Sequence, residues 1–406
     1  MEQRWVAWFK LFLVAFFLAF AGSFVALTVR GAKQAGAVSS WPDSEPQASP
    51  FPAPRASIPE LLRRLDRLEV LRLRPSWEVE VGSGQALLSL EGDRLYVASS
   101  TDSSGSSLYC LDARSGAVLW SRTLDAWISS PPSPWKEVVY VGTTSHVLHA
   151  VDAQSGNELW SFTAQGEILT RPLADDGLLL FFADNNAVFG LSNRLYALDP
   201  GSGALLWSYD TESWTPSPPA TGQGLIFTAG SKSTVLALDR NTGREVWVKP
   251  VDSAVFSSPL LAGDRLYVAT VDGRMYALDI RTGERLWEVG MYHFTPSFSR
   301  TAKGNVLLDR CPDRVLALSM EDGRIRWGLG GNPLLAAGPQ SPEVVYVYFP
   351  EGRLLELDAD TGRCLRIYVF GFDFSQRPYV SGGWVYCVSS DGKIRACLLP
   401  QASTAD

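Results

Sequence analysis

Short apolar runs separated by polar turns follow one another along most of the chain. In residues 256–287, the apolar run 266–268 precedes Asp272-Gly273, a two-residue hairpin signal, because such turns need residues that tolerate positive φ. A second turn ends at Gly283, and the strand that follows it is led by Trp287. The segment therefore predicts a unit of four short strands.

The second turn and its tryptophan recur as the pattern D-x-x-[ST]-G-x-x-x-W. Its aspartates are Asp112, Asp152, Asp199, Asp239, Asp279 and Asp358. Its turn glycines are Gly116, Gly156, Gly203, Gly243, Gly283, Gly323 and Gly362, and tryptophans lead strands at Trp77, Trp120, Trp160, Trp207, Trp247, Trp287 and Trp327. Successive glycines lie 39 or 40 residues apart, except for one step of 47 residues around an insertion near residues 184–193. Four strands at this period are typical of propeller blades.

Two copies of the pattern are incomplete. Ser319 takes the place of the aspartate in the copy that ends at Trp327, and Arg366 takes the place of the tryptophan in the last copy. An arginine at that position fits either a surface salt bridge or a contact with a partner.

The two ends of the repeat region complete each other. Residues 77–81 form a strand led by Trp77 that has no strand before it to pair with, and residues 384–398 form a hairpin that lacks a final strand. If the N-terminal strand completes the C-terminal blade, the ring closes and leaves no open blade at its ends. The sequence thus predicts an all-β, eight-bladed β-propeller of four-stranded blades closed by an N-terminal strand. If the last copy of the pattern, which ends at Arg366, is not a true repeat, seven blades are expected.

The repeat residues themselves are expected to hold the fold together. Each turn aspartate and its serine or threonine can accept and donate hydrogen bonds within the turn, and each tryptophan can wedge between neighbouring blades. A catalytic residue is needed once, whereas a packing device is needed in every blade. We therefore expect no catalytic and no metal-binding residue among them.

These units resemble the quinoprotein-like, or PQQ-like repeat, propeller family. Residues 277–287 and 237–247 match its A-x-D-x-x-T-G-x-x-x-W pattern, and its Ser-Pro pairs have counterparts at residues 130–131, 217–218 and 258–259. The resemblance covers residues 75–400. It implies either a quinone-dependent alcohol or sugar dehydrogenase, which would hold PQQ and Ca²⁺ over the central channel, or a non-catalytic scaffold of the BamB-like branch.

The residues favour the scaffold. The adjacent cysteines that often accompany the quinone are lacking, and His146, His149 and His293 have no metal or triad spacing. The oxygen-rich clusters are Asp175-Asp176, which Gly177 follows as in a hairpin turn, and Asp184-Asn185-Asn186 in the insertion. We expect turns at both, and no cofactor.

The N-terminal region differs from the repeats. Residues 11–29 carry no charge over a length that spans a bilayer, which predicts a signal-anchor within residues 1–30 and an extracytoplasmic propeller. The alternative is a cleaved signal and a secreted protein. Residues 31–56 are rich in Pro, Ser and Ala and predict a tether. Residues 57–74 predict a short amphipathic helix that packs on the propeller or contacts anionic lipid, and residues 401–406 a tail.

Composition narrows the choice of partners. The 406 residues include 36 Lys and Arg against 43 Asp and Glu, a net charge of −7, which argues against nucleic acid as a partner.

The five cysteines contain no C-x-x-C and are expected to be small buried side chains. A two-residue turn at Asp391-Gly392 would pair Cys387 with Ala396, so that Cys387 and Cys397 would face opposite sides of the sheet. The function expected is a membrane-tethered extracytoplasmic scaffold that binds a protein or ligand, as a monomer or within a complex.

Overall fold

A computed structural model describes most of the repeat region. It covers residues 70–400, apart from 82–85, 102–104, 125, 185–192, 212, 214, 216, 291–296, 301–304, 312–313, 331–333 and 336–342. The regular elements of the described residues are β-strands, as the alternation of apolar runs and turns predicts. No helix among them has the length and apolar character needed to cross a bilayer. The predicted anchor, the tether, residues 57–69 of the predicted helix and the tail lie outside the described residues.

The described strands form eight sheets. The first five are β3–β6 (Ala86–Glu91, Arg94–Thr101, Gly105–Asp112, Val118–Leu124), β7–β10 (Ser133–Trp135, Val138–Gly142, Val147–Asp152, Glu158–Thr163), β11–β14 (Leu173–Asp175, Leu178–Asp184, Asn193–Leu198, Leu205–Asp210), β15–β18 (Ala220–Gly222, Leu225–Ala229, Thr234–Asp239, Glu245–Pro250) and β19–β22 (Leu260–Ala262, Arg265–Ala269, Arg274–Asp279, Arg285–Gly290). The other three are β23–β26 (Ser297–Arg300, Asn305–Cys311, Arg314–Ser319, Ile325–Gly330), β27–β30 with β1 (Leu334–Leu335, Val344–Phe349, Arg353–Asp358, Cys364–Phe370 and Val70–Leu73) and β31–β33 with β2 (Tyr379–Ser381, Trp384–Val388, Ile394–Leu398 and Trp77–Val79).

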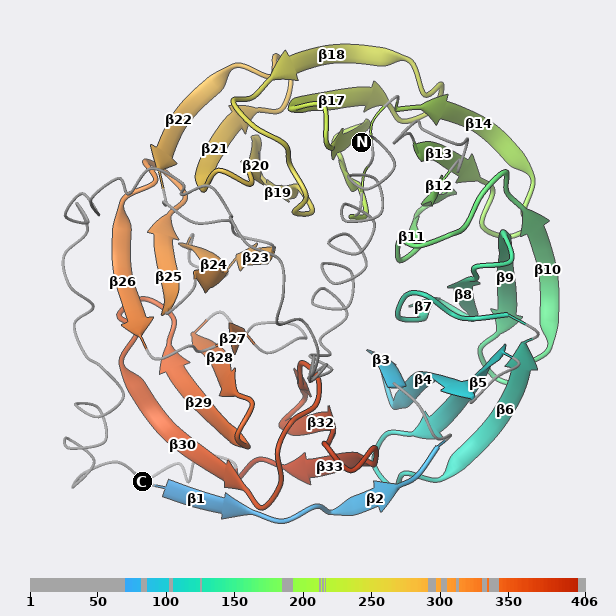
Figure 1. Cartoon of the computed structure of the whole chain (residues 1–406), viewed down its shortest axis with the longest axis vertical. Helices are drawn as coiled ribbons and strands as arrows, with labels where there is room; N and C mark the ends of the chain where they lie inside the picture. The colour runs from blue at the N-terminus through green and yellow to red at the C-terminus, as the bar shows by residue number, and fades with distance from the viewer. Residues whose placement is uncertain are drawn as a thin grey trace, which may run out of the picture.

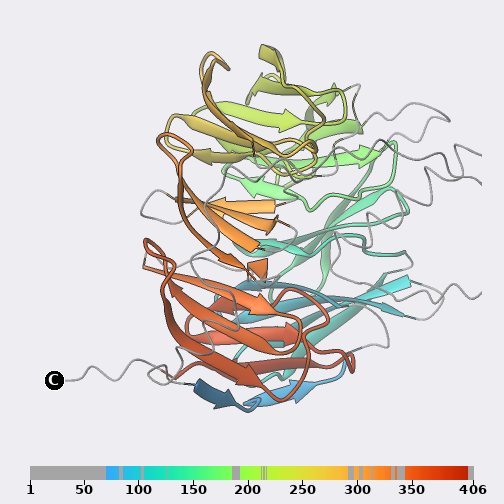
Figure 2. The same ribbon diagram turned by 60° about the vertical axis from the view of Figure 1, so that its left-hand side comes forward.

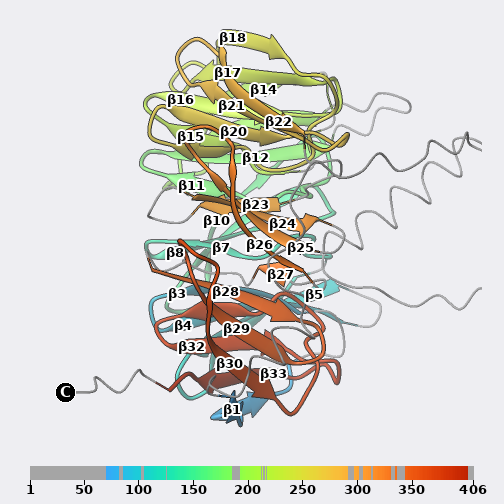
Figure 3. The ribbon, with the colours of Figure 1, turned by 90° about the vertical axis from the view of Figure 1, so that its left-hand side faces the viewer.

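The sheets stand around a common axis and make a β-propeller (Figure 1). The first strand of each four-stranded repeat, such as β3, β7 or β11, lies nearest the axis. The strands that carry the repeat tryptophan, such as β6, β10 and β14, lie on the outside, and the tryptophan is their third residue rather than their first. Inner strands of successive sheets contact one another, as β3 does β7 and β7 does β11. Turned by 60° and 90°, the ring is seen from the side (Figures 2 and 3). Among the outermost strands, we call β6, β10, β14, β18 and β22 the outer rim.

The core lies between neighbouring sheets. One cluster joins Phe227 and Trp247 of the β15–β18 sheet to Leu266, Val268 and Tyr276 of the next. Middle strands are therefore covered on both faces, which explains the unbroken apolar run of β12, LLLFFA. Outer strands such as β10 alternate between half-buried and exposed residues instead.

The N-terminal strand joins the C-terminal hairpin, as the two incomplete ends predicted. Trp77, Glu78 and Val79 of β2 pair antiparallel with Ala396, Arg395 and Ile394 of β33. The last sheet is thus built from both ends of the repeat region, and its fourth strand, β2, comes from the start of that region.

The end of the predicted amphipathic helix is a strand. Val70–Leu73 form β1, which pairs in parallel with Ile367–Phe370 of β30 and is the fifth strand of that sheet. In β1, Leu71 and Leu73 lie on one side and pack against a cluster that includes Tyr368 and Phe370. The alternation of Val, Leu, Arg and Leu suits a strand, and an available sheet edge outweighs the helical spacing of the leucines before it. The propeller therefore begins before the predicted boundary at residue 75.

The predicted register of the last hairpin is wrong by one residue. The amide of Ser389 donates to the Lys393 carbonyl, which leaves three residues in the turn, and Cys387 therefore pairs with Arg395 rather than with Ala396. Because a shift of one residue reverses the face of every side chain, Cys387 and Cys397 share one face and one core cluster. Both are buried free thiols, as are Cys110 and Cys364.

Candidate functional site: the turns, the ring closure and the outer rim

The turn aspartates organise their own turns. Asp239 Oδ1 accepts hydrogen bonds from the amides of Asn241 and Thr242 at 3.2 and 2.9 Å and from the Thr242 hydroxyl at 2.7 Å. These bonds stabilise the charged carboxylate, so the pKa of Asp239 lies below its ordinary value. In the other turns, too, the amide three residues after the aspartate donates to its Oδ1. These aspartates are Asp112, Asp152, Asp199, Asp279 and Asp358. The side chains are engaged in holding the backbone.

Each tryptophan packs on the turn glycine of the next sheet. A Cβ placed on any of these glycines would lie within 2.8 Å of the preceding indole, and all seven have positive φ. The pairs are Trp77–Gly116, Trp120–Gly156, Trp160–Gly203, Trp207–Gly243, Trp247–Gly283, Trp287–Gly323 and Trp327–Gly362. Glycine is needed twice at this position, for its left-handed backbone and for the close approach of a ring. The pattern thus links each sheet to the one after it.

Two further contacts hold each tryptophan: a small residue opposite it on the neighbouring strand, and in most sheets a backbone carbonyl that accepts its indole N–H. In β17 and β18, Ala237 lies opposite Trp247, and the same alanine–tryptophan pairing occurs in five further sheets, with Cys110 opposite Trp120 in the first. The indole N–H of Trp247 donates to the Ile280 carbonyl of the next sheet at 2.9 Å. Trp160 departs from this arrangement: its buried N–H has no hydrogen-bond partner among the described residues, and the carbonyl of Pro200 accepts the Tyr140 hydroxyl instead.

Arg366 has a partner that sequence reasoning missed. It lies opposite Glu356, which occupies the place that alanine takes in most other sheets, and its Nη1 lies 3.3 Å from Glu356 Oε1. The Tyr368 hydroxyl also donates to Glu356. The last sheet has no turn between its third and fourth strands, because its fourth strand is β2, so no turn glycine exists for a tryptophan at residue 366. Of the two expected roles, the salt bridge is the one found, but Glu356 is buried and the pair does not lie on the surface as expected. The glutamate in place of alanine was its signal in the sequence.

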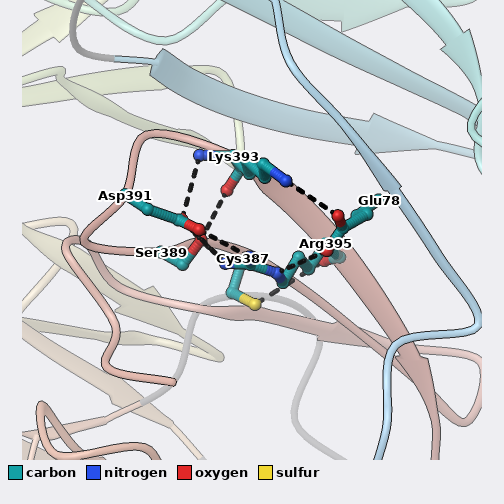
Figure 4. A network of polar contacts seen from close by, with 6 residues as sticks. All are labelled: Glu78, Cys387, Ser389, Asp391, Lys393 and Arg395. Carbon is teal, nitrogen blue, oxygen red and sulfur yellow. Dashed lines mark hydrogen bonds and ion pairs between the residues drawn. The ribbon is translucent and has the colours of Figure 1, made fainter. Parts of the chain in front are cut away.

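A charged network holds the ring closure together (Figure 4). Arg395 of β33 is nearly buried, and its guanidinium bonds both carboxylate oxygens of Asp391 at 2.8 and 2.6 Å. It also donates to Glu78 of β2 at 3.1 Å, and Lys393 donates to Glu78 at 2.8 Å. Lys393, directly before β33, and Arg395 within it therefore both bind one carboxylate of the N-terminal strand β2.

This network predicts a loss of stability in acid. Hydrogen bonds from Arg395 and then Ser389 hold the pKa of Asp391 well below its ordinary value near 3.8. A carboxyl whose pKa is lowered by folding contributes its stability fully above the unfolded value, and the contribution is lost as the pH falls through the lowered pKa. Asp391→Asn should therefore lower the urea midpoint at pH 7 and progressively less below pH 4. A difference from wild type that stays constant between pH 7 and pH 3 would contradict the role of this carboxylate.

The structure describes the first of the two oxygen-rich clusters, and only Asp184 of the second. Asp176 and Gly177 form the turn between β11 and β12, as predicted, and Gly177 has φ +75°. Asp175 pairs with Arg240 at 2.5 Å and accepts from Thr221, while Asp176 pairs with Lys136. Asp184 ends β12, and residues 185–192 of the insertion lie outside the described residues.

The quinone-dependent dehydrogenases that the repeat resembles would hold a calcium ion. Ca²⁺ takes six to eight oxygen ligands. Within the described ranges, no three His, Cys, Asp or Glu side chains gather closely enough to share a cation. Since Asp175 and Asp176 are already paired with Arg240 and Lys136, the described residues do not fit such an ion.

The outer rim exposes apolar side chains on five consecutive sheets. Leu159 of β10 is 52% exposed, and similar fractions apply to the residues directly before the tryptophans of the other four strands. The residues that directly precede a tryptophan are Leu119, Leu159, Leu206, Val246 and Leu286, and Val118, Leu205 and Val248 are exposed beside them on the same strands. Apolar residues that are exposed singly are common, and large exposed apolar patches are a feature of interaction sites. Here exposed apolar residues recur beside the tryptophan of five consecutive outer strands.

The comparisons with known proteins agree with this architecture. The model of a family described as outer membrane protein assembly factor BamB matches residues 74–143, 133–194 and 191–333. No curated protein sequence matches the chain.

Three solved structures share the fold. BamB from Moraxella catarrhalis is 18% identical and superposes with a TM-score of 0.62 over 80% of this chain and 100% of its own. The computationally designed Ika8 protein is 16% identical, with a TM-score of 0.63 over 82% and 100%. Quinohemoprotein alcohol dehydrogenase from Comamonas testosteroni is 15% identical, with a TM-score of 0.62 over 81% and 78%. At these identities the likeness concerns the fold alone.

Proposed function

Because this chain belongs to the family described as outer membrane protein assembly factor BamB, we propose that it is a non-catalytic scaffold that binds a protein partner outside the cytoplasm. Its eight sheets would act as the blades of one rigid eight-bladed propeller. Residues 11–29 would hold it at a membrane, since they carry no charge over a bilayer's length.

The observation that carries this proposal is the exposed apolar series of the outer rim. The turn aspartates, tryptophans and glycines are all engaged in packing, so the repeat leaves little chemistry for a reaction. The rim, in contrast, offers Leu159, Leu206 and Leu286 to solvent on a rigid frame. A rigid surface binds with little loss of conformational entropy, which suits a scaffold.

The test is capture of a partner from intact membranes. Chemical crosslinking followed by affinity purification should recover a specific protein with the wild-type chain, and the double variant Leu159→Arg, Leu206→Arg should lose it. Trp127→Arg is the matched control, because Trp127 is 50% exposed but precedes the short inner strand β7. It should capture the partner as the wild type does.

Two results would overturn the scaffold. One is the absence of any specific protein in the wild-type capture. The other is a bound-cofactor absorbance and dye reduction with alcohols or sugars after incubation with pyrroloquinoline quinone and calcium, the behaviour expected of the quinone-dependent dehydrogenases that share this repeat.

A further inference from the structure

Strand β10 has an open backbone edge. It is the last strand of its sheet among the described residues. The amide of Ala164, directly after β10, donates to the His146 carbonyl at 2.8 Å, so the backbone of Ala164 points toward β9. Residues of an antiparallel strand alternate in the side to which they direct their amides and carbonyls. Ser161 and Thr163 therefore direct theirs away from the sheet.

The chain itself shows what such an edge can bind. In β30 the amide of Phe370 donates to the Gly352 carbonyl at 2.8 Å, the counterpart of the Ala164 bond. The outward positions are then Ile367 and Val369, and these lie opposite Val70 and Arg72 of the parallel strand β1. An extended segment with leucines at alternate positions thus occupies the outer edge of one sheet.

The edge of β10 matches that of β30 more closely than its neighbours do. Phe162 and Ala164 stand where β30 has Tyr368 and Phe370, and residues 161–164 carry no charge. The other strands of the rim differ within the same four positions: β6 has Arg122, β14 has Asp210, β18 has Lys249 and Pro250, and β22 has Glu288. Charges and prolines are features that keep an exposed edge from pairing. Pro250 also lacks the outward amide.

We propose that the edge of β10 at Ser161 and Thr163 binds an extended segment of a partner protein as an added parallel strand. The segment would carry apolar side chains at alternate positions, as β1 carries Leu71 and Leu73, and these would lie beside Phe162 and Ala164. Main-chain hydrogen bonds give such a complex its affinity and the alternate side chains its specificity. The inference rests on the proposed function, since it names how and where the scaffold would hold its partner.

The experiment removes one backbone donor and leaves the rim otherwise unchanged. A photo-crosslinking amino acid replaces Leu159, which is exposed beside the edge, and the crosslinked peptide is identified by mass spectrometry from intact membranes. Thr163→Pro takes away the outward amide and copies the arrangement of Pro250 in β18. Thr163→Val keeps the amide, and Gly290→Pro makes the same change at the matching position of β22.

The expected result is a crosslinked peptide with alternate apolar residues that Thr163→Pro reduces at least tenfold, while Thr163→Val and Gly290→Pro leave it within twofold. A partner captured equally by Thr163→Pro would overturn the added strand and leave the scaffold standing. Equal loss in Gly290→Pro, capture of a helical segment or lipid, or capture of a second copy of this chain would also overturn it. If no protein is captured at all, both proposals fail.

Discussion

Replacing Trp247 with alanine is expected to lower the free energy of unfolding by about 3–5 kcal/mol, the range found for removing a large buried aromatic side chain. Trp247 is 9% exposed and its ring contacts Gly283 of the next sheet. The substitution leaves a cavity between two sheets and removes the hydrogen bond to the Ile280 carbonyl. Urea unfolding followed by tryptophan fluorescence or circular dichroism measures the change.

Two companion variants separate the causes. Trp247→Phe keeps most of the apolar contact but leaves the Ile280 carbonyl without the indole donor, so its loss should be smaller than that of alanine. Trp127→Ala removes a tryptophan that is 50% exposed and should change stability by no more than about 0.5 kcal/mol. Equal effects at Trp247 and Trp127 would show that the indole is not a link between sheets.

Replacing Gly243 with alanine is expected to lower stability by about 2–5 kcal/mol. The residue has φ +66°, where a side chain costs about 1–2 kcal/mol. The added Cβ would also lie 2.5 Å from Cε3 of Trp207, and such overpacking typically costs a further 1–3 kcal/mol or so. The indole is fixed by its hydrogen bond to the Arg240 carbonyl at 3.0 Å and cannot easily move away.

Gly224 provides the matched control. Its φ of +77° imposes the same backbone cost on alanine, but no atom lies within 4 Å of the position of a Cβ. Gly224→Ala should therefore cost about 1–2 kcal/mol. The difference between the two variants measures the steric contact with Trp207, and thermal or urea midpoints that coincide would contradict that contact.

Much of the fold was predictable because it repeats. The spacing of Asp239, Gly243 and Trp247 encodes a turn and a strand locally, and its recurrence predicted a propeller repeat without any knowledge of how the units are arranged. The unpaired strand at Trp77 and the incomplete hairpin at residues 384–398 gave the pairing of β2 with β33, because each lacked what the other supplied.

Other features depended on longer-range geometry. The turn of three residues between Ser389 and Lys393 is one residue longer than the turn that Asp391-Gly392 suggested, and this placed Cys387 and Cys397 on the same face. The outward amides of Ser161 and Thr163 follow from the direction of a single hydrogen bond, that of Ala164 to His146. No residue type marks such an orientation in the sequence.

By itself, the sequence determined the propeller repeat, the packing roles of its aspartates, glycines and tryptophans, and the strand that closes the ring, since each of these arises from contacts that recur at a fixed spacing. Only the tertiary structure decided that Val70–Leu73 is a strand on the edge of β30 and that Arg366 pairs with Glu356. At residue 366 the turn that would receive a tryptophan is missing, because the last sheet takes its fourth strand, β2, from the start of the repeat region. What a residue contacts there is set by closure of the whole ring and not by its neighbours in the chain.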